Sequence, residues 1–94
     1  MRVRPLFALG QVVATPAALE ALRLHTIDPM ELLTRHVTGD WGDLHAEDAA
    51  QNEIGVLCSN RILSSYVIGD TSLPLWIVTE ADRSVTTLLL PEDY

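Results

Sequence analysis

The chain has 94 residues, 48% of them hydrophobic and 20% charged, and this composition predicts one folded domain rather than a disordered segment. Thirteen acidic residues and six arginines, with no lysine, give a formal net charge of -7. An acidic surface repels phosphate backbones, so we expect a protein partner and no direct binding of nucleic acid. The same charge is also compatible with a role in solubility alone.

The single cysteine, Cys58, excludes an intrachain disulfide and a thiolate zinc cluster within one chain. No stretch has the length of a membrane span, and the apolar run at 6–9 is too short for a signal-peptide core. We therefore expect a cytoplasmic protein without a cofactor, in which a homo-oligomer is an open alternative. Because Cys58 ends an apolar segment, we expect its side chain to be buried.

The stretch 11–14 is a short strand candidate, and a helix is expected directly after it. Thr15 followed by Pro16 has the arrangement of an N-cap and a proline in the first helical position. This helix should end near residue 24, with Leu19 and Leu22 facing inward.

Asp28 followed by Pro29 predicts the start of a second helix, with Glu31 at the capping-box spacing. The helix should stop near Gly39, because glycine readily adopts the left-handed conformation that ends helices. It should carry Leu32, Leu33, His36 and Val37, and His36 is expected to be its last inward residue.

A third helix is expected over residues 44–57, with Asp43 as its cap. Its apolar residues recur at helical spacing on one side, which we expect to face the core. These residues are Ala46, Ala50, Ile54 and Leu57.

From Arg61 the hydrophobic period changes to two, which predicts strands over 61–68, 73–80 and 85–90, with a loop at 69–72 and a turn at 81–84. The order of elements predicts an α+β fold of one domain, residues 1–94. In this fold two or three short N-terminal helices pack on a C-terminal three- or four-stranded antiparallel sheet.

Imidazole and carboxylate groups are dense in the middle of the chain, at His36, Asp40, Asp43, His45 and Asp48. Their spacing matches no zinc signature, so we expect no metal site. We interpret Asp40 and Asp43 as turn and cap residues, and His36 as an inward residue of its helix.

The expected binding surface combines an acidic segment with the tip of the last hairpin. Its residues are Asp40, Trp41, Asp43, Glu47, Asp48, Asn52, Glu80, Asp82, Arg83 and Thr87. The tip residue Arg83 can instead serve only to pair with a neighbouring carboxylate. Trp41 and Trp76 are core residues if they are buried and interface anchors if they are exposed.

A ribonuclease-like enzyme is the alternative function, since helices followed by an antiparallel sheet are similar in outline to the barnase, EndoU and RelE group. In that interpretation His45 or His36 is the general acid or base, and Arg61 or Arg83 stabilises charge on phosphorus. Ser64 or Thr86 then positions the phosphate. Those enzymes are generally basic, whereas this chain is acidic and lysine-free.

Two sequence blocks resemble a family of small uncharacterised proteins of plasmids, prophages and other mobile elements. They are GDWGDL at 39–44 and WIVTEADRSVTTLLLPEDY at 76–94. The resemblance implies no established activity. It implies an accessory factor of a mobile element, with an anti-defence or regulatory role, that docks on a host protein or on a protein of the element.

Overall fold

The computed structural model describes residues 4–69 and 73–94, which form an α+β fold, as expected. Residues 70–72 of the expected loop lie outside the described residues. One sheet has the strand order β1-β4-β3-β2, built from β1 (Gln11–Ala14), β2 (Ile62–Ile68), β3 (Leu73–Thr79) and β4 (Val85–Leu89). The helices are α1 (Pro16–Leu24), α2 (Pro29–Val37) and α3 (Ala46–Cys58), and a short 3-10 turn, η1 (Pro91–Asp93), follows β4.

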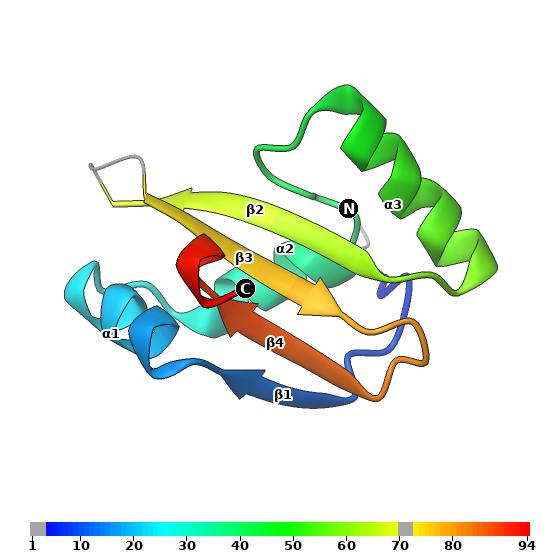
Figure 1. Ribbon diagram of the computed structural model, residues 1–94. Coiled ribbons are helices and arrows are strands. Elements are labelled where there is room, and N and C mark those ends of the chain that lie inside the picture. Colours follow the sequence, from blue (N-terminus) through cyan, green and yellow to red (C-terminus); the bar gives the residue numbers. More distant parts are fainter. Residues whose placement is uncertain (1–3, 70–72) are drawn as a thin grey trace.

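The sheet is mixed, which corrects the expectation of a purely antiparallel sheet. β2 and β4 flank β3 in antiparallel orientation, whereas β1 pairs with β4 in parallel, with Gln11 opposite Val85. A parallel pair requires a long crossover connection, and here the chain from α1 to β3 provides it. β1 consequently forms one edge of the sheet (Figure 1).

The hydrophobic core lies between one face of the sheet and the helices α1 and α2. Figure 1 shows α2 behind the sheet and η1 in front of it. Alternation along β2 directs Ile62, Ser64, Tyr66 and Ile68 to the core side, where all four are buried. The core also contains Ala18, Ala21, Leu22, Leu32, Leu33, Leu75, Ile77 and Leu88. Leu19 is 54% exposed, so its expected inward position is wrong.

The predicted caps of α1 and α2 are confirmed. The hydroxyl of Thr15 accepts a hydrogen bond from the Ala18 N–H at 3.1 Å, and a carboxylate oxygen of Asp28 accepts one from the Met30 N–H at 3.0 Å. These caps satisfy N–H groups that have no partner inside the helix. No helix that the structure describes combines the length and the apolarity that a bilayer crossing requires.

The edge of β2 is covered by the segment before α3 and by a side chain of α3. The Ser65 N–H donates to the Trp41 carbonyl at 3.1 Å, and the Asp43 N–H donates to the Ser65 carbonyl at 2.6 Å. The Asn52 amide then pairs with Leu63, donating to its carbonyl at 2.6 Å and accepting from its N–H at 3.1 Å. Two backbone positions of this edge are therefore protected from pairing with another chain.

Glycine is required between the two pairing residues of this edge segment. Gly42 has a φ of +77°, and a Cβ there would lie 2.1 Å from the Ser65 carbonyl oxygen. The block GDWGDL thus contains a residue that permits close backbone contact with β2.

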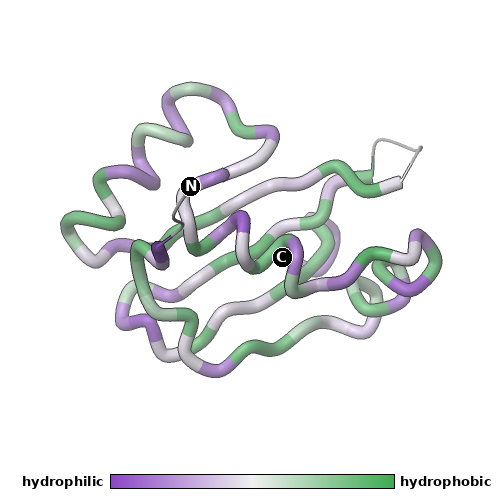
Figure 2. The backbone as a smooth tube through the Cα atoms, turned by 180° about the vertical axis from the view of Figure 1, so that it is seen from behind, coloured by the Kyte–Doolittle hydropathy of each residue, from purple (hydrophilic) through white to green (hydrophobic). Residues whose placement is uncertain are grey.

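The orientation of α3 differs from the expectation. Its buried residues are Asn52 and Gly55, and the four apolar residues expected in the core are all exposed: Ala46, Ala50, Ile54 and Leu57. Gly55 allows the helix to approach β2, because a Cβ there would lie 2.8 Å from Ile62 Cδ1. Polar contacts and a close approach at a glycine, and not the expected apolar face, therefore attach α3 to the sheet. Figure 2 shows hydrophobic residues toward the C-terminal end of α3, at the periphery of the molecule.

Two further expectations around α3 are corrected. His45, and not Asp43, is the N-cap residue, and its side chain makes no capping hydrogen bond. Asp43 cannot take that position because its backbone is paired with β2. Cys58 is exposed, since the side of α3 that carries it faces away from the sheet.

Candidate functional site

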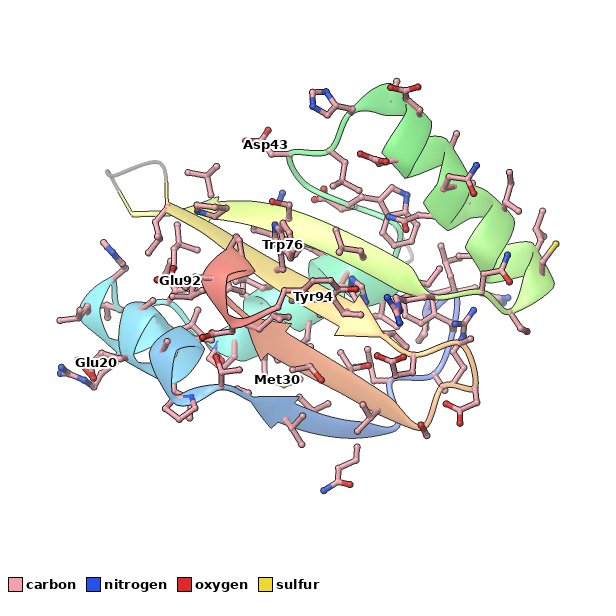
Figure 3. All side chains as sticks on the ribbon, in the orientation of Figure 1. Glu20, Met30, Asp43, Trp76, Glu92 and Tyr94 are labelled. Carbon is pink, nitrogen blue, oxygen red and sulfur yellow. The ribbon has the colours of Figure 1, made fainter. Side chains whose placement is uncertain are left out.

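A groove with a volume of about 530 Å³ lies between α3 and the sheet face opposite the core. Its floor consists of Leu63, Ser65 and Trp76, which alternation and strand register direct away from the helices α1 and α2. Trp76 is half-buried, and its ring lies 5.6 Å from the Tyr94 ring in an edge-to-face arrangement. Figure 3 shows these two rings side by side in front of β3, and Asp43 on the segment before α3.

The floor contains polar and apolar residues that the sequence interpretation did not assign to a site. Ser65 is 8% exposed, and its hydroxyl has no hydrogen-bond partner among residues 4–69 and 73–94. Two signals could have identified this floor: the period of two along β2, and the presence of a tryptophan in the next predicted strand. Sequence reasoning used the period for the core and left the opposite face unassigned.

The wall of the groove is acidic. Asp43 and Asp48 line it together with His45, and neither carboxylate forms an ion pair within the part of the chain that the structure describes. Arg61 lies at the groove as well, but its guanidinium is 3.7 Å from a Glu80 carboxylate oxygen and donates to the Tyr94 hydroxyl at 2.6 Å. Glu80 partly offsets the charge of Arg61, and the two carboxylates without an ion pair leave the groove acidic.

Glu47 and Asp48 also occupy the first turn of α3, where carboxylates offset the positive end of the helix dipole. Glu47 is exposed and does not line the groove, whereas Asp48 does. Both carboxylates therefore stabilise the start of α3, and only Asp48 also lines the groove.

Asp40 and Trp41 serve mainly to hold the edge segment. Arg35 Nε donates to Asp40 at 2.7 Å, and this hydrogen bond, with a second one from the Gly42 N–H, holds the pKa of Asp40 below its ordinary value. The Trp41 ring is buried, and its Nε1–H donates to Glu53 at 2.9 Å. Trp41 is therefore a core residue.

The hairpin tip lies against the C-terminal end of α3. Arg83 donates to the Asn60 carbonyl at 2.6 Å and to the Gly55 carbonyl at 2.9 Å, and its guanidinium lies 5.3 Å from the Phe7 ring centroid. Carbonyls at a helix C-terminus attract a cation, so Arg83 acts as a structural clamp. Asp82 accepts from the Ser84 N–H at 3.0 Å and closes the turn.

The structure thus separates the two parts of the expected binding surface. Asp43, Asp48 and Asn52 adjoin the groove near the start of α3, whereas Asp82 and Arg83 lie near its end. Glu80 reaches the groove only through Arg61, and Thr87 is half-buried on the sheet face opposite the core.

His36 lies in a buried chain of hydrogen bonds. Its Nδ1 is 2.6 Å from the Ser64 hydroxyl, and its Nε2 is 2.9 Å from the Thr79 hydroxyl. The Thr79 hydroxyl is 2.7 Å from that of Thr86, which donates to the Leu9 carbonyl at 2.7 Å. Burial, and secondarily the positive charge of Arg83, lower the pKa of His36 to about 4.

The residues of the ribonuclease alternative are not brought into one cleft. His45 and Arg61 line the groove, but Ser64 and Thr86 are 0% exposed on the opposite, core-facing side of the sheet. Arg83 is engaged with carbonyl groups at the end of α3. The Ser64–His36 pair has the distance of an activated nucleophile and its base, yet both side chains are inaccessible to a substrate in this structure.

Among the described residues, no group of three or more histidine, cysteine or carboxylate side chains is arranged to hold a metal ion. The groove and the exposed face of α3 are the two surface features through which this chain could bind a partner.

Comparisons of the chain with protein-family models, with curated proteins and with solved structures find no match.

Proposed function

We propose that this chain is a small protein-binding module that docks through the outer face of α3. The observation that carries the proposal is the outer stripe, defined as Ala46, Ala50, Ile54 and Leu57, which faces solvent. Leu57 is 85% exposed and Ile54 is 46% exposed. Large apolar side chains on one helix face, next to charged residues, are typical of a protein interface.

The manner in which α3 is attached supports this proposal. Asn52 and Gly55 face the sheet, and Arg83 holds the carbonyl end of the helix, so the outer stripe contributes nothing to the core. Burial of the stripe against a partner would therefore add apolar contact without loss of internal packing.

The charge around the stripe indicates the chemistry of the partner. α3 carries Glu47, Asp48 and Glu53 and no basic residue. We infer a partner surface with an apolar centre and basic residues at its rim. The resemblance to mobile-element proteins extends the proposal to a cytoplasmic accessory factor that acts on a host protein or on a protein of the element, in an anti-defence or regulatory role.

Substitution of the stripe tests the proposal. The tagged chain is used to capture proteins from a host lysate, and the same capture is repeated with the double variant Ile54→Ser, Leu57→Ser. We expect a stoichiometric partner that the variant binds at least about tenfold more weakly, because exposed apolar anchors dominate interface energies.

The matched control is Leu24→Ser, which removes an apolar side chain that is 64% exposed at the end of α1. Circular dichroism checks that all variants are folded. Equal capture by the native chain and by the stripe variant would contradict docking through α3.

A further inference from the structure

We propose that the groove between α3 and the sheet binds an arginine side chain of the docked partner. This inference rests on the proposed function, because the arginine belongs to the protein that covers α3. It adds a specific pocket and a specific chemical group to a surface otherwise defined by apolar contact.

The floor of the groove matches the two parts of an arginine side chain. Leu63 offers apolar contact for the methylene stem, and the indole of Trp76 offers an aromatic surface for the guanidinium. Arginine is the cation that most often packs on tryptophan, because its guanidinium is planar and weakly hydrated. The groove, at about 530 Å³, has room for this side chain and for part of the backbone that carries it.

The acidic wall matches the charge and the donors of a guanidinium. Asp43 and Asp48 both line the groove, and no cation in the described ranges forms an ion pair with either. A guanidinium presents five N–H donors in a fixed fork and can bond two carboxylates at once, which an ammonium group does with less geometric selectivity.

The Ser65 hydroxyl adds a polar group to the floor of the groove. Ser65 is 8% exposed at the floor of the groove, and its hydroxyl lacks a partner in the described part of the chain. No side-chain oxygen of the described residues is both shielded from solvent and without a partner, so the Ser65 hydroxyl is open to the groove and an entering donor can reach it. A guanidinium N–H that enters the groove can donate to this hydroxyl oxygen.

The position of the groove allows one partner to use both features. Asp48 and Gln51 of α3 face the groove, while Ala50 and Ile54, in the same turns, face solvent on the outer stripe. A partner segment that crosses α3 can therefore bury the stripe and direct an arginine over the N-terminal half of the helix into the groove.

The test uses a small probe in place of the partner. The peptide acetyl-Ala-Arg-Ala-amide is titrated into the isotopically labelled chain, and the Trp76 indole N–H and the Ser65 backbone N–H are followed by NMR. We expect saturable shifts of both signals. The same peptide with citrulline, which has nearly the same shape but no charge, should produce neither shift.

Substitutions in the acidic wall test which carboxylates bind the arginine peptide. We expect Asp43→Asn and Asp48→Asn each to weaken binding of the arginine peptide roughly threefold, and the double variant roughly tenfold. Glu47→Gln removes the same charge one residue away but outside the groove, and binding should stay within about twofold of the native value. Trp76→Leu should weaken binding roughly fivefold.

Equal shifts with the citrulline peptide, or equal weakening by Glu47→Gln and Asp48→Asn, would overturn the proposal. The stripe variant Ile54→Ser, Leu57→Ser distinguishes it from the proposed function, since that variant should bind the arginine peptide normally. Partner capture that is lost in the stripe variant and unchanged in Asp43→Asn, Asp48→Asn would refute the groove and leave docking on α3 in place.

Discussion

The hydroxyl of Thr86 sets the direction of every hydrogen bond in the buried chain around His36. Thr86 donates to the Leu9 carbonyl, so it can only accept from the Thr79 hydroxyl. Thr79 must then accept from Nε2 of His36, which therefore carries the proton. Nδ1 of the imidazole accepts from the Ser64 hydroxyl. A second proton on His36 would sit on Nδ1 and point at the hydroxyl proton of Ser64, so this hydrogen bond would be lost.

This arrangement predicts a loss of stability in mild acid. The pKa of His36 falls from 6.5 in the unfolded chain to about 4 in the folded protein, so below pH 6.5 the unfolded state binds a proton that the folded state does not. The stabilisation is complete above about pH 6.5 and is lost as pH falls toward 4. Urea denaturation should show the free energy of unfolding decreasing by about 2 kcal/mol between pH 7 and pH 5.

His36→Gln should remove most of this pH dependence, whatever its effect on stability at pH 7. His45→Gln is the control, since His45 is exposed, and it should keep the native slope. A His36→Gln protein whose stability still falls by about 2 kcal/mol over this interval would show that another group is responsible.

The helices α1 and α2 could be predicted from sequence because local residues determine where they begin. Thr15 and Asp28 bond N–H groups two or three residues away, which is a short-range effect. The orientation of α3 could not be predicted, because its inward face is selected by Leu63, eleven residues further along the chain, through a pair of amide hydrogen bonds. Hydrophobic spacing alone favoured the opposite face.

Asn52→Ala should destabilise the fold through the same pair of bonds. The substitution leaves the N–H and the carbonyl of Leu63 without their partner at a partly buried position, and we expect a loss of about 1–3 kcal/mol in the free energy of unfolding. Chemical denaturation measures it. Gln51→Ala changes an exposed amide in the neighbouring position and should alter stability by less than about 0.5 kcal/mol; a similar loss in both variants would argue against the role assigned to Asn52.

The excess of negative charge acts on the whole molecule. The net charge is -7, and the three ion pairs among the described residues, Arg23–Glu20, Arg35–Asp40 and Arg61–Glu80, join exposed side chains. Such pairs contribute little, whereas the remaining carboxylates repel one another in the folded state.

Salt should therefore affect folding and binding in opposite directions. An increase from about 20 mM to about 500 mM NaCl screens the repulsion, and we expect the free energy of unfolding to rise by up to about 1 kcal/mol. Thermal denaturation measures this rise. Partner capture should weaken over the same range, because attraction to a basic rim is screened as well. Capture that strengthens with salt would indicate a partner recognised by apolar contact alone.

The fold class followed from the order of elements along the chain, but the arrangement of the sheet did not. β1 has four residues, and its partner β4 lies near the other end of the sequence. The local hydrophobic pattern contains no information on the pairing of two strands so far apart in the sequence. The turns that fix the β2–β3–β4 order do not involve β1 either. The groove depends on that order, since Ser65 and Trp76 are neighbours only through the β2–β3 register.

The parallel pairing of β1 with β4 also has a consequence for synthesis on the ribosome. Gln11 is made well before its partner Val85, because most of the domain lies between them in the sequence. Until then β3, with its apolar run Leu75, Trp76, Ile77 and Val78, has an unpaired edge, and β1 has no strand to join. The sheet must therefore remain incomplete until β4 has been made, and a transcript that ends before β4 would yield a chain in which β3 keeps an open edge and β1 stays unpaired, instead of a smaller version of this domain.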